Sequence, residues 1–226
     1  MADRVSLRRL ALATGLWPII WIHATYLLAA AEGHVPWCFP YIDSCTSISA
    51  TGRHGLAWWL FKATMLPYAV LLLLFWRAMA DELIQLGDHR AAAAWIRGMG
   101  TVAAIFLVVY TVALGAVGDF FQLQRRIGII LYFSMTAFSQ LLFTWRLGRL
   151  GIPDGTRTWH LGICYGFLSI GVFSLILDAS IPNYDDYEDA FEWVLALIMH
   201  GYFLVMVVTL GQDSFADAKK SALSGA

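Results

Sequence analysis

The chain has 226 residues, of which 59% are hydrophobic and 14% are charged, and its formal net charge at pH 7 is -1. Its mean hydropathy of +0.65 exceeds that of water-soluble domains of this size, so the composition excludes an ordinary soluble globular fold and indicates a membrane protein. The near-neutral charge conceals an uneven distribution, because basic residues lie mostly in alternate loops and an acidic group lies at residues 185–189.

Apolar windows long enough to cross a membrane recur along the chain. A hydrocarbon core of about 30 Å requires about 20 apolar residues in a helix. The windows are 10–31, 56–77, 98–118, 127–146, 159–180 and 190–211. We therefore predict an all-α fold, a single integral membrane bundle of six transmembrane helices over residues 1–226. The small polar tail at about 214–226 is predicted to be disordered.

The basic residues predict that the N- and C-termini are both cytoplasmic, because lysine and arginine accumulate in cytoplasmic loops. With the N-terminus inside, only Arg53, Lys62, Arg125 and Arg126 fall on the outer side, and the other eleven of the fifteen basic residues fall inside. These inner residues are interpreted as membrane anchors, so nucleic acid is not an expected partner. The predicted location is an endomembrane or the plasma membrane.

The first outer loop contains the segment "GHVPWCFPYIDSC" at 33–45, which mixes prolines, aromatic residues, two cysteines and an aspartate. The prolines end the first helix and fix the turn, and the aromatic residues suit the membrane interface. We interpret the segment as a lid over the outer end of the bundle. A disulfide between Cys38 and Cys45 is expected only if the loop faces an oxidising compartment, which the sequence leaves open.

Glycines recur at helix-packing spacing in two spans. They are Gly162 and Gly166 in the fifth span, and Gly115 and Gly118 at the outer end of the third. Small residues let helix backbones approach closely in lipid, so we expect tight helix contacts at both pairs.

Polar residues four apart form a stripe on the fourth span, because Thr136, Gln140 and Thr144 lie on one helix face. We expect the stripe to face the bundle interior and to form interhelical hydrogen bonds. Lining a conduit is the alternative.

Ionisable residues gather at the outer end of the spans, and each is a hypothesis for a functional site because charge in lipid is costly. Lys62 lies about two turns into the second span, Asp119 is placed at the outer end of the third, Asp178 ends the fifth, and Glu192 begins the sixth. One interpretation pairs Lys62 with Asp178 or Glu192 as a structural contact. Another places these residues in a polar pocket open to lipid headgroups of the outer leaflet.

Two histidines, His23 and His200, lie deeper in the first and sixth spans. They can donate hydrogen bonds to neighbouring helices, or His200 can share the interior with Glu192. Metal ligation is a third reading, but the chain has neither HxxxH nor CxxC spacing, so no metal site is predicted.

Short motifs along the whole chain resemble a six-span family that includes the damage-regulated autophagy modulators, the Frag and Sfk proteins and the post-GPI-attachment lipid-remodelling proteins. Pro40, Tyr41 and Ile42 match the family pattern Pro-Tyr-Ile-Ser-Asp-x-Gly, whereas the pair Asp43-Ser44 reverses the next two residues and the glycine is missing.

Two further segments contribute to this resemblance. "GAVGDFFQ" at 115–122 is similar to the glycine-rich end of the family's third span, and Glu192-Trp193 to the start of its last span. The chain departs from the family before the fourth span, where many members have a histidine and this sequence has Arg125-Arg126.

The resemblance implies a role in membrane lipid biology, because family roles include GPI-anchor remodelling, autophagy modulation and phosphoinositide signalling. Our leading hypothesis is an integral membrane protein that binds, remodels or organises membrane lipids through a polar outer-leaflet pocket. Membrane lipids are the expected partners, protein partners are an additional expectation, and no cofactor is predicted.

The candidate site combines residues assigned by the resemblance with residues chosen for their charge. The resemblance assigns Pro40, Tyr41, Asp43, Gln122, Glu192 and Trp193, and the charge pattern adds Lys62, Asp119, Asp178 and His200. In this hypothesis Glu192 and Asp43 orient polar groups at the pocket mouth and Lys62 attracts a phosphate. Trp193, Tyr41 and Trp37 lie at the membrane interface.

Two other classes of function stay open at this point. One is an intramembrane lipid acyl hydrolase or transferase, with His200 or His23 as general base. The other is a non-catalytic scaffold or regulator of autophagy or lipid signalling, in which the outer loop or the inner segment at 78–97 binds a partner.

Overall fold

The computed structural model describes residues 4–150, 154–213, 215 and 217, which form helices and contain no strand. The long helices are α1 (Arg4–Ala31), α4 (Gly55–Gln85), α5 (Arg90–Ala113), α6 (Asp119–Arg149), α7 (Asp154–Ser180) and α8 (Asp185–Thr209). Two short helices, α2 (Pro40–Asp43) and α3 (Ile48–Thr51), lie between α1 and α4. Each predicted window falls on one of the six long helices, all of which are long and apolar enough to cross a membrane.

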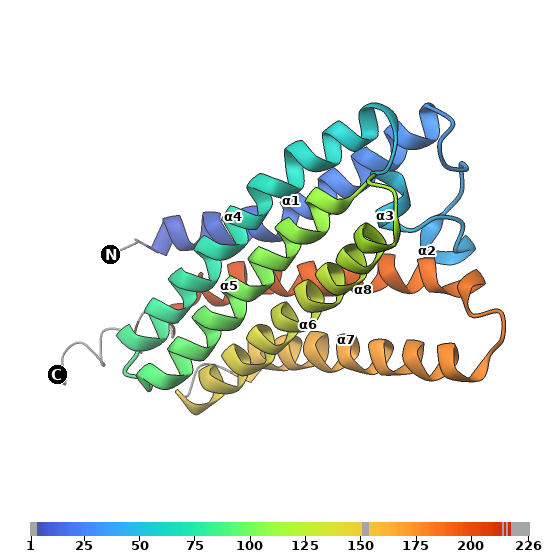
Figure 1. The fold of residues 1–226 in the computed structure, drawn as a ribbon. Coiled ribbons are helices and arrows are strands. Elements are labelled where there is room, and N and C mark those ends of the chain that lie inside the picture. The colour runs from blue at the N-terminus through green and yellow to red at the C-terminus, as the bar shows by residue number, and fades with distance from the viewer. Residues whose placement is uncertain (1–3, 151–153, 214, 216, 218–226) are drawn as a thin grey trace.

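The start of α1 and the end of α8 lie at one end of the bundle, and α2 and α3 lie at the other (Figure 1). We call the end formed by 32–54, 114–118 and 181–184 the loop end, and the opposite end the terminal end. Helix α1 packs against α4 and α8, α5 packs between α4 and α6, and α7 packs against α6 and α8. The predicted disorder of the tail at 214–226 concerns residues that lie, apart from 215 and 217, outside the described part of the chain.

The turns are shorter than the sequence windows indicated. Helix α4 continues to Gln85 and α5 begins at Arg90, so most of the inner segment at 78–97, which lies between the second and third predicted windows, is helical. At the loop end, α5 stops at Ala113 instead of continuing to 118. The chain reverses there through Gly115 and Gly118, whose φ angles are +82° and +117°. Such positive φ angles are readily adopted only by glycine.

The prediction that these two glycines pack helices was therefore wrong, because they form a turn. The second predicted glycine pair was wrong as well. A Cβ atom added at Gly162 or Gly166 would have no heavy atom within 4 Å, so neither glycine permits a close helix contact. Close approach occurs instead at Gly100, where an added Cβ would lie 2.3 Å from the Trp76 Cβ.

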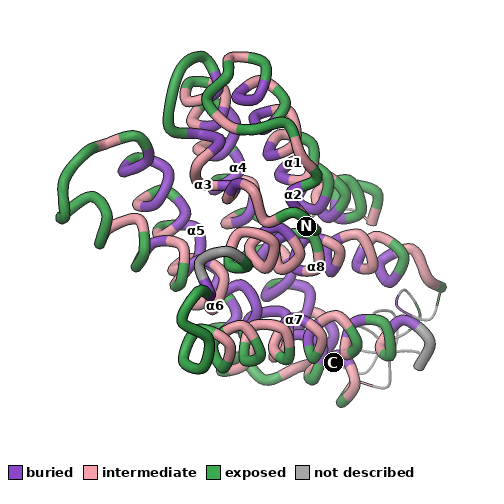
Figure 2. Tube along the Cα trace, turned by 90° about the vertical axis from the view of Figure 1, so that its right-hand side faces the viewer, coloured by how far each residue is buried: buried purple, intermediate pink, exposed green. Residues whose placement is uncertain are grey.

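Aromatic side chains fill the centre of the bundle between α4 and α8. Phe75 and Trp76 are fully buried, and the Phe75 ring meets the Phe203 ring edge to face with 4.9 Å between centroids. Figure 2 shows buried positions facing one another between helices, while exposed positions lie on loops and outward faces. Within lipid, such packing, rather than a hydrophobic force, holds helices together.

The polar stripe of α6 faces this interior, as predicted. Thr136, Gln140 and Thr144 are completely buried. The Gln140 side-chain amide donates to the Met199 carbonyl at 2.9 Å, and the Thr144 hydroxyl bonds the Tyr202 hydroxyl at 2.9 Å. Gln140 and Thr144 thus join α6 to α8 through hydrogen bonds, whereas the buried Thr136 hydroxyl has no hydrogen-bond partner among the described residues.

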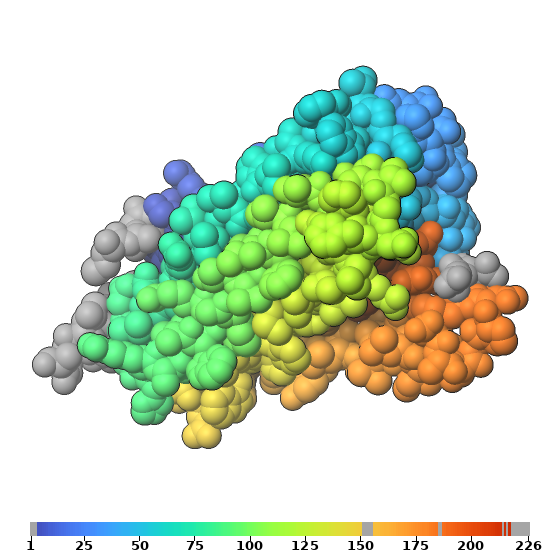
Figure 3. Space-filling view, in the orientation of Figure 1, coloured from blue at the N-terminus to red at the C-terminus, as the bar shows by residue number. Residues whose placement is uncertain are grey.

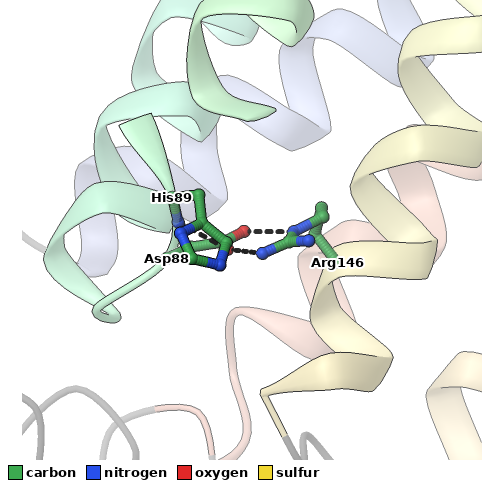
Figure 4. Close-up of polar contacts among 3 residues, drawn as sticks. All are labelled: Asp88, His89 and Arg146. Carbon is green, nitrogen blue, oxygen red and sulfur yellow. Dashed lines mark hydrogen bonds and ion pairs between the residues drawn. The ribbon is translucent and has the colours of Figure 1, made fainter. Parts of the chain in front are cut away.

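A buried ion pair joins the α4–α5 turn to α6 at the terminal end (Figure 4). Arg146 Nε donates to Asp88 Oδ2 at 2.7 Å, and Arg146 Nη2 donates to Asp88 Oδ1. The side chains of Asp88 and Arg146 are only 1% and 12% exposed. Because the carboxylate and guanidinium contact each other through two bonds, the geometry is the strongest form of this pairing.

Candidate functional site

A cleft of about 430 Å³ opens at the loop end, between the segment leading into α4 and the α5–α6 turn. Its lining residues are Arg53, His54, Gly115, Ala116, Val117, Gly118, Asp119, Gln122 and Arg125. In the space-filling view the green α5–α6 turn stands beside the cyan segment that leads into α4 (Figure 3). The volume lies within the range of small-molecule sites, roughly 300–1,000 Å³.

The wall of the cleft depends on the glycine turn. Trp58 Nε1 donates to the Leu114 carbonyl at 2.8 Å, which holds the turn against α4. A Cβ atom at Gly115 would lie 2.5 Å from Trp58 Nε1 and 3.0 Å from the Arg53 carbonyl oxygen. The close approach and the positive φ angle together require glycine at this position.

Cations from both neighbouring helices bind the carbonyl groups at the end of α5. Lys62 Nζ donates to the Val112 carbonyl at 3.1 Å and lies 4.0 Å from the centroid of the Trp58 ring. Arg125 Nη1 donates to the carbonyls of Ala113 and Ala116, at 3.2 and 2.8 Å. The last carbonyls of a helix lack intrahelical partners and attract positive charge.

These contacts correct the predicted pairing of Lys62, whose ammonium binds a helix end and not Asp178 or Glu192. The position of Asp119 also differs from the prediction, because Asp119 is the first residue of α6 and not the end of the third span. Asp119 and Gln122 are the two predicted site residues that line the cleft.

The arginines of the cleft have no acidic partner within 4 Å in the described part of the chain. All ion pairs found there involve other residues. Arg53 Nη2 instead donates to the Ser49 hydroxyl at 3.0 Å, and Arg125 is held by the carbonyls described above. Each guanidinium therefore keeps N–H donors that its own contacts leave available, as an anionic ligand requires.

A separate aromatic cluster surrounds His23 between α1, α2 and α8. His23 Nδ1 lies 2.6 Å from the Ile19 carbonyl and must donate to it, so His23 Nε2 accepts from the Tyr41 hydroxyl at 2.9 Å. Burial raises the pKa of Tyr41 above its usual 10.0, which keeps this donor protonated. Trp193 packs against both rings, is completely buried, and donates to the Thr46 carbonyl at 2.8 Å. The Trp193 ring is therefore enclosed by protein, and its predicted depth at the membrane interface stays a prediction.

The remaining loop residues shape α2. Pro40 is buried at the first position of α2, and Asp43 Oδ2 accepts from the Phe39 backbone N–H at 2.7 Å. Asp43 thus stabilises its own short helix and does not line the cleft. Cys38 and Cys45 form a disulfide, with 6.6 Å between their Cα atoms. The resulting closed segment covers α1 and α8, so its lid-like position lies beside the cleft and not over it.

The other predicted residues are dispersed along α7 and α8. Glu192 is half-buried, with a hydrogen bond to the backbone of Ile48. His200 lies deep in the bundle, where its Nδ1 donates to the carbonyl one turn earlier at 2.5 Å and its Nε2 accepts from the Tyr132 hydroxyl at 3.1 Å. Asp178 is exposed near the end of α7. These residues do not form one pocket with the cleft.

Sequence reasoning missed Arg53, His54 and Arg125 as site residues. The distribution of basic residues could have identified the two arginines, because Arg53 and Arg125 are two of only four basic residues assigned to the outer side. Both also lie near the glycine-rich segment at 115–118 in the fold, although only Arg125 is near it in sequence.

Comparison of the chain with protein-family models, curated proteins and solved structures found no match. Within the described residues, no group of three or more His, Cys, Asp or Glu side chains is placed to hold a metal ion. The cleft itself offers charged side chains and hydrogen-bond donors.

Proposed function

We propose that this protein binds the phosphate-bearing headgroup of a membrane lipid in the cleft at the loop end. The observation that supports the proposal is a cleft lined by both Arg53 and Arg125, neither of which forms an ion pair within 4 Å with a carboxylate of the described residues. Guanidinium groups match phosphate oxygens in geometry and charge, and the Gln122 amide adds a neutral donor.

The depth of the cleft supports a lipid as the source of that phosphate. Trp59 and Arg77 are both exposed on α4 and are 18 residues apart, which corresponds to about 27 Å along the helix. This length matches a hydrocarbon core of about 30 Å bounded by interfacial tryptophan and arginine. Arg53 precedes Trp59 by six residues, so the cleft falls at headgroup depth.

The rim of the cleft also suits contact with lipid. Val117 and Phe120, on and just after the α5–α6 turn, are 93% and 72% exposed. Apolar side chains at the edge of a charged cleft can rest among acyl chains while the headgroup contacts the arginines. The family resemblance of the sequence agrees with a lipid ligand, and the basic-residue distribution predicts that the loop end lies in the outer leaflet.

Native mass spectrometry of purified protein in detergent tests the proposal. The probe is dioleoyl phosphatidylglycerol, titrated against wild type, Arg53→Gln and Arg125→Gln. Arg126→Gln is the matched control, because Arg126 is exposed next to Arg125 but does not line the cleft. We expect each cleft variant to bind the lipid about threefold to tenfold more weakly and the control to bind like wild type.

Two results would contradict the proposal. The first is an equal loss of binding in Arg53→Gln and Arg126→Gln, which would indicate a general surface-charge effect. The second is complete displacement of the lipid by millimolar inorganic phosphate, which would identify a site for free phosphate. Thermal unfolding of each variant checks that the loss of the Arg125 carbonyl bonds has not unfolded the protein.

The acyl-transfer and regulator hypotheses stay predictions. In the described structure the Nε2 atoms of His23 and His200 both accept from tyrosine hydroxyls, so neither histidine presents a free basic nitrogen to a cavity.

A further inference from the structure

The cleft holds side chains of both charges that do not pair with each other. Asp119 lines the same cleft as Arg53 and Arg125, yet no ion pair within 4 Å joins Asp119 to either arginine. An exposed ion pair gains little free energy, so modest competing contacts are enough to keep such charges apart.

Each of the two arginines is held by a contact of its own. The carbonyls of Ala113, at the end of α5, and Ala116, in the α5–α6 turn, hold Arg125, and the Ser49 hydroxyl holds Arg53. Asp119 lies in the first turn of α6, where the helix dipole favours a negative charge. The cleft therefore presents charges of both signs that do not pair, with two arginines held by neighbouring groups and one carboxylate exposed at the start of α6.

We infer that the preferred ligand is a zwitterionic phospholipid, whose phosphate contacts Arg53 and Arg125 while its ammonium contacts Asp119. The inference rests on the proposed function and adds the class of headgroup to it. An anionic headgroup such as phosphoglycerol satisfies the arginines but places neutral hydroxyls beside the Asp119 carboxylate. A phosphoethanolamine or phosphocholine headgroup satisfies both signs of charge.

A competition between two matched lipids tests this assignment. Dioleoyl phosphatidylethanolamine and dioleoyl phosphatidylglycerol have the same chains and one phosphodiester each, and they differ in the group beyond the phosphate. Native mass spectrometry of an equimolar mixture measures the ratio of the two bound lipids. We expect wild type to favour the ethanolamine lipid about threefold to fivefold, the range of one partly exposed ion pair.

The variant Asp119→Asn should bring this ratio close to one by weakening binding of the ethanolamine lipid. The matched control is Asp178→Asn, because Asp178 is also exposed near the loop end but does not line the cleft. This control should keep the wild-type ratio. If Asp119→Asn does not fold, the preference of wild type alone decides the question.

Equal or tighter binding of the glycerol lipid by wild type would overturn the inference, as would an unchanged ratio in Asp119→Asn. Failure of the inference is distinguishable from failure of the proposed function through Arg53→Gln. If that variant weakens binding of both lipids while wild type shows no preference, the headgroup site stands and the zwitterion assignment falls. If Arg53→Gln binds both lipids like wild type, both proposals fall.

Discussion

Replacement of Asp88 by alanine should destabilise the protein far more than replacement of Asp81, although both aspartates bind an arginine. Asp88 is 1% exposed and its partner Arg146 is 12% exposed, whereas Asp81 and its partner Arg97 are 58% and 45% exposed. The comparison therefore keeps the chemistry of the pair and changes its burial.

The magnitude follows from what each substitution leaves behind. Asp88→Ala removes both acceptors of the Arg146 guanidinium and also the acceptor of the His89 backbone N–H, which lies 2.7 Å from Asp88 Oδ1. An uncompensated buried charge costs about 3–5 kcal/mol. Asp81→Ala leaves Arg97 in contact with water, so its expected cost is about 0–1 kcal/mol.

Unfolding by dodecyl sulfate in mixed micelles, followed by tryptophan fluorescence, measures these free energies. A third variant, Asp88→Ala combined with Arg146→Leu, separates the two causes of instability. It removes the stranded charge, so it should be more stable than Asp88→Ala alone. Equal costs for Asp88→Ala and Asp81→Ala, or a double variant no better than Asp88→Ala, would refute the burial argument.

Two further predictions concern packing and the loop. Gly100→Ala should lower the free energy of unfolding by about 1–3 kcal/mol in the same assay, because its Cβ would overlap Trp76. Gly98→Ala, with no heavy atom within 4 Å of its added Cβ, should be neutral or stabilising by up to about 1 kcal/mol, and a reversed order of these two variants would contradict the packing described for α5. Replacement of both Cys38 and Cys45 by alanine should cost about 2–3 kcal/mol, as loop closure over a separation of seven residues implies. Mass spectrometry of the unreduced protein would disprove the disulfide if both thiols took up an alkylating reagent.

The sequence allowed prediction of the features that depend on local periodicity. Each apolar window corresponded to a helix because the bilayer thickness sets a minimum length that few other structures satisfy. The inward face of α6 was predictable because Thr136, Gln140 and Thr144 share one side of a helix, and exposing them to lipid would leave polar groups without partners.

The partners of individual charges were not predictable in the same way. One interpretation paired Lys62 with a carboxylate, but its ammonium donates to a backbone carbonyl of α5, and an acceptor of that kind cannot be recognised from residue types. The two glycines at 115 and 118 have a spacing that fits both helix packing and a turn. The positive φ angles show that these glycines form a turn. They could not be predicted without knowing where α5 ends.

The cleft itself was predictable only in part, for a related reason. Asp119 was selected for its charge at the outer end of a span and Gln122 from the family resemblance, and both line the cleft. Arg53 lies far from both in the sequence and joins them through the packing of α4 against α5. The spacing of residues along the sequence does not predict a long-range contact of this kind.

The capped end of α5 has a consequence for biogenesis. Its final carbonyls depend on Lys62 and Trp58 from the preceding long helix and on Arg125 from the following one. During insertion, a nascent chain in which α5 has entered the membrane before α6 lacks the Arg125 contacts. Carbonyls at the end of α5 then have no side-chain hydrogen-bond donor from α6. Completion of α5 is thus coupled to arrival of α6, and α4, α5 and α6 should assemble in the membrane as one cooperative three-helix unit.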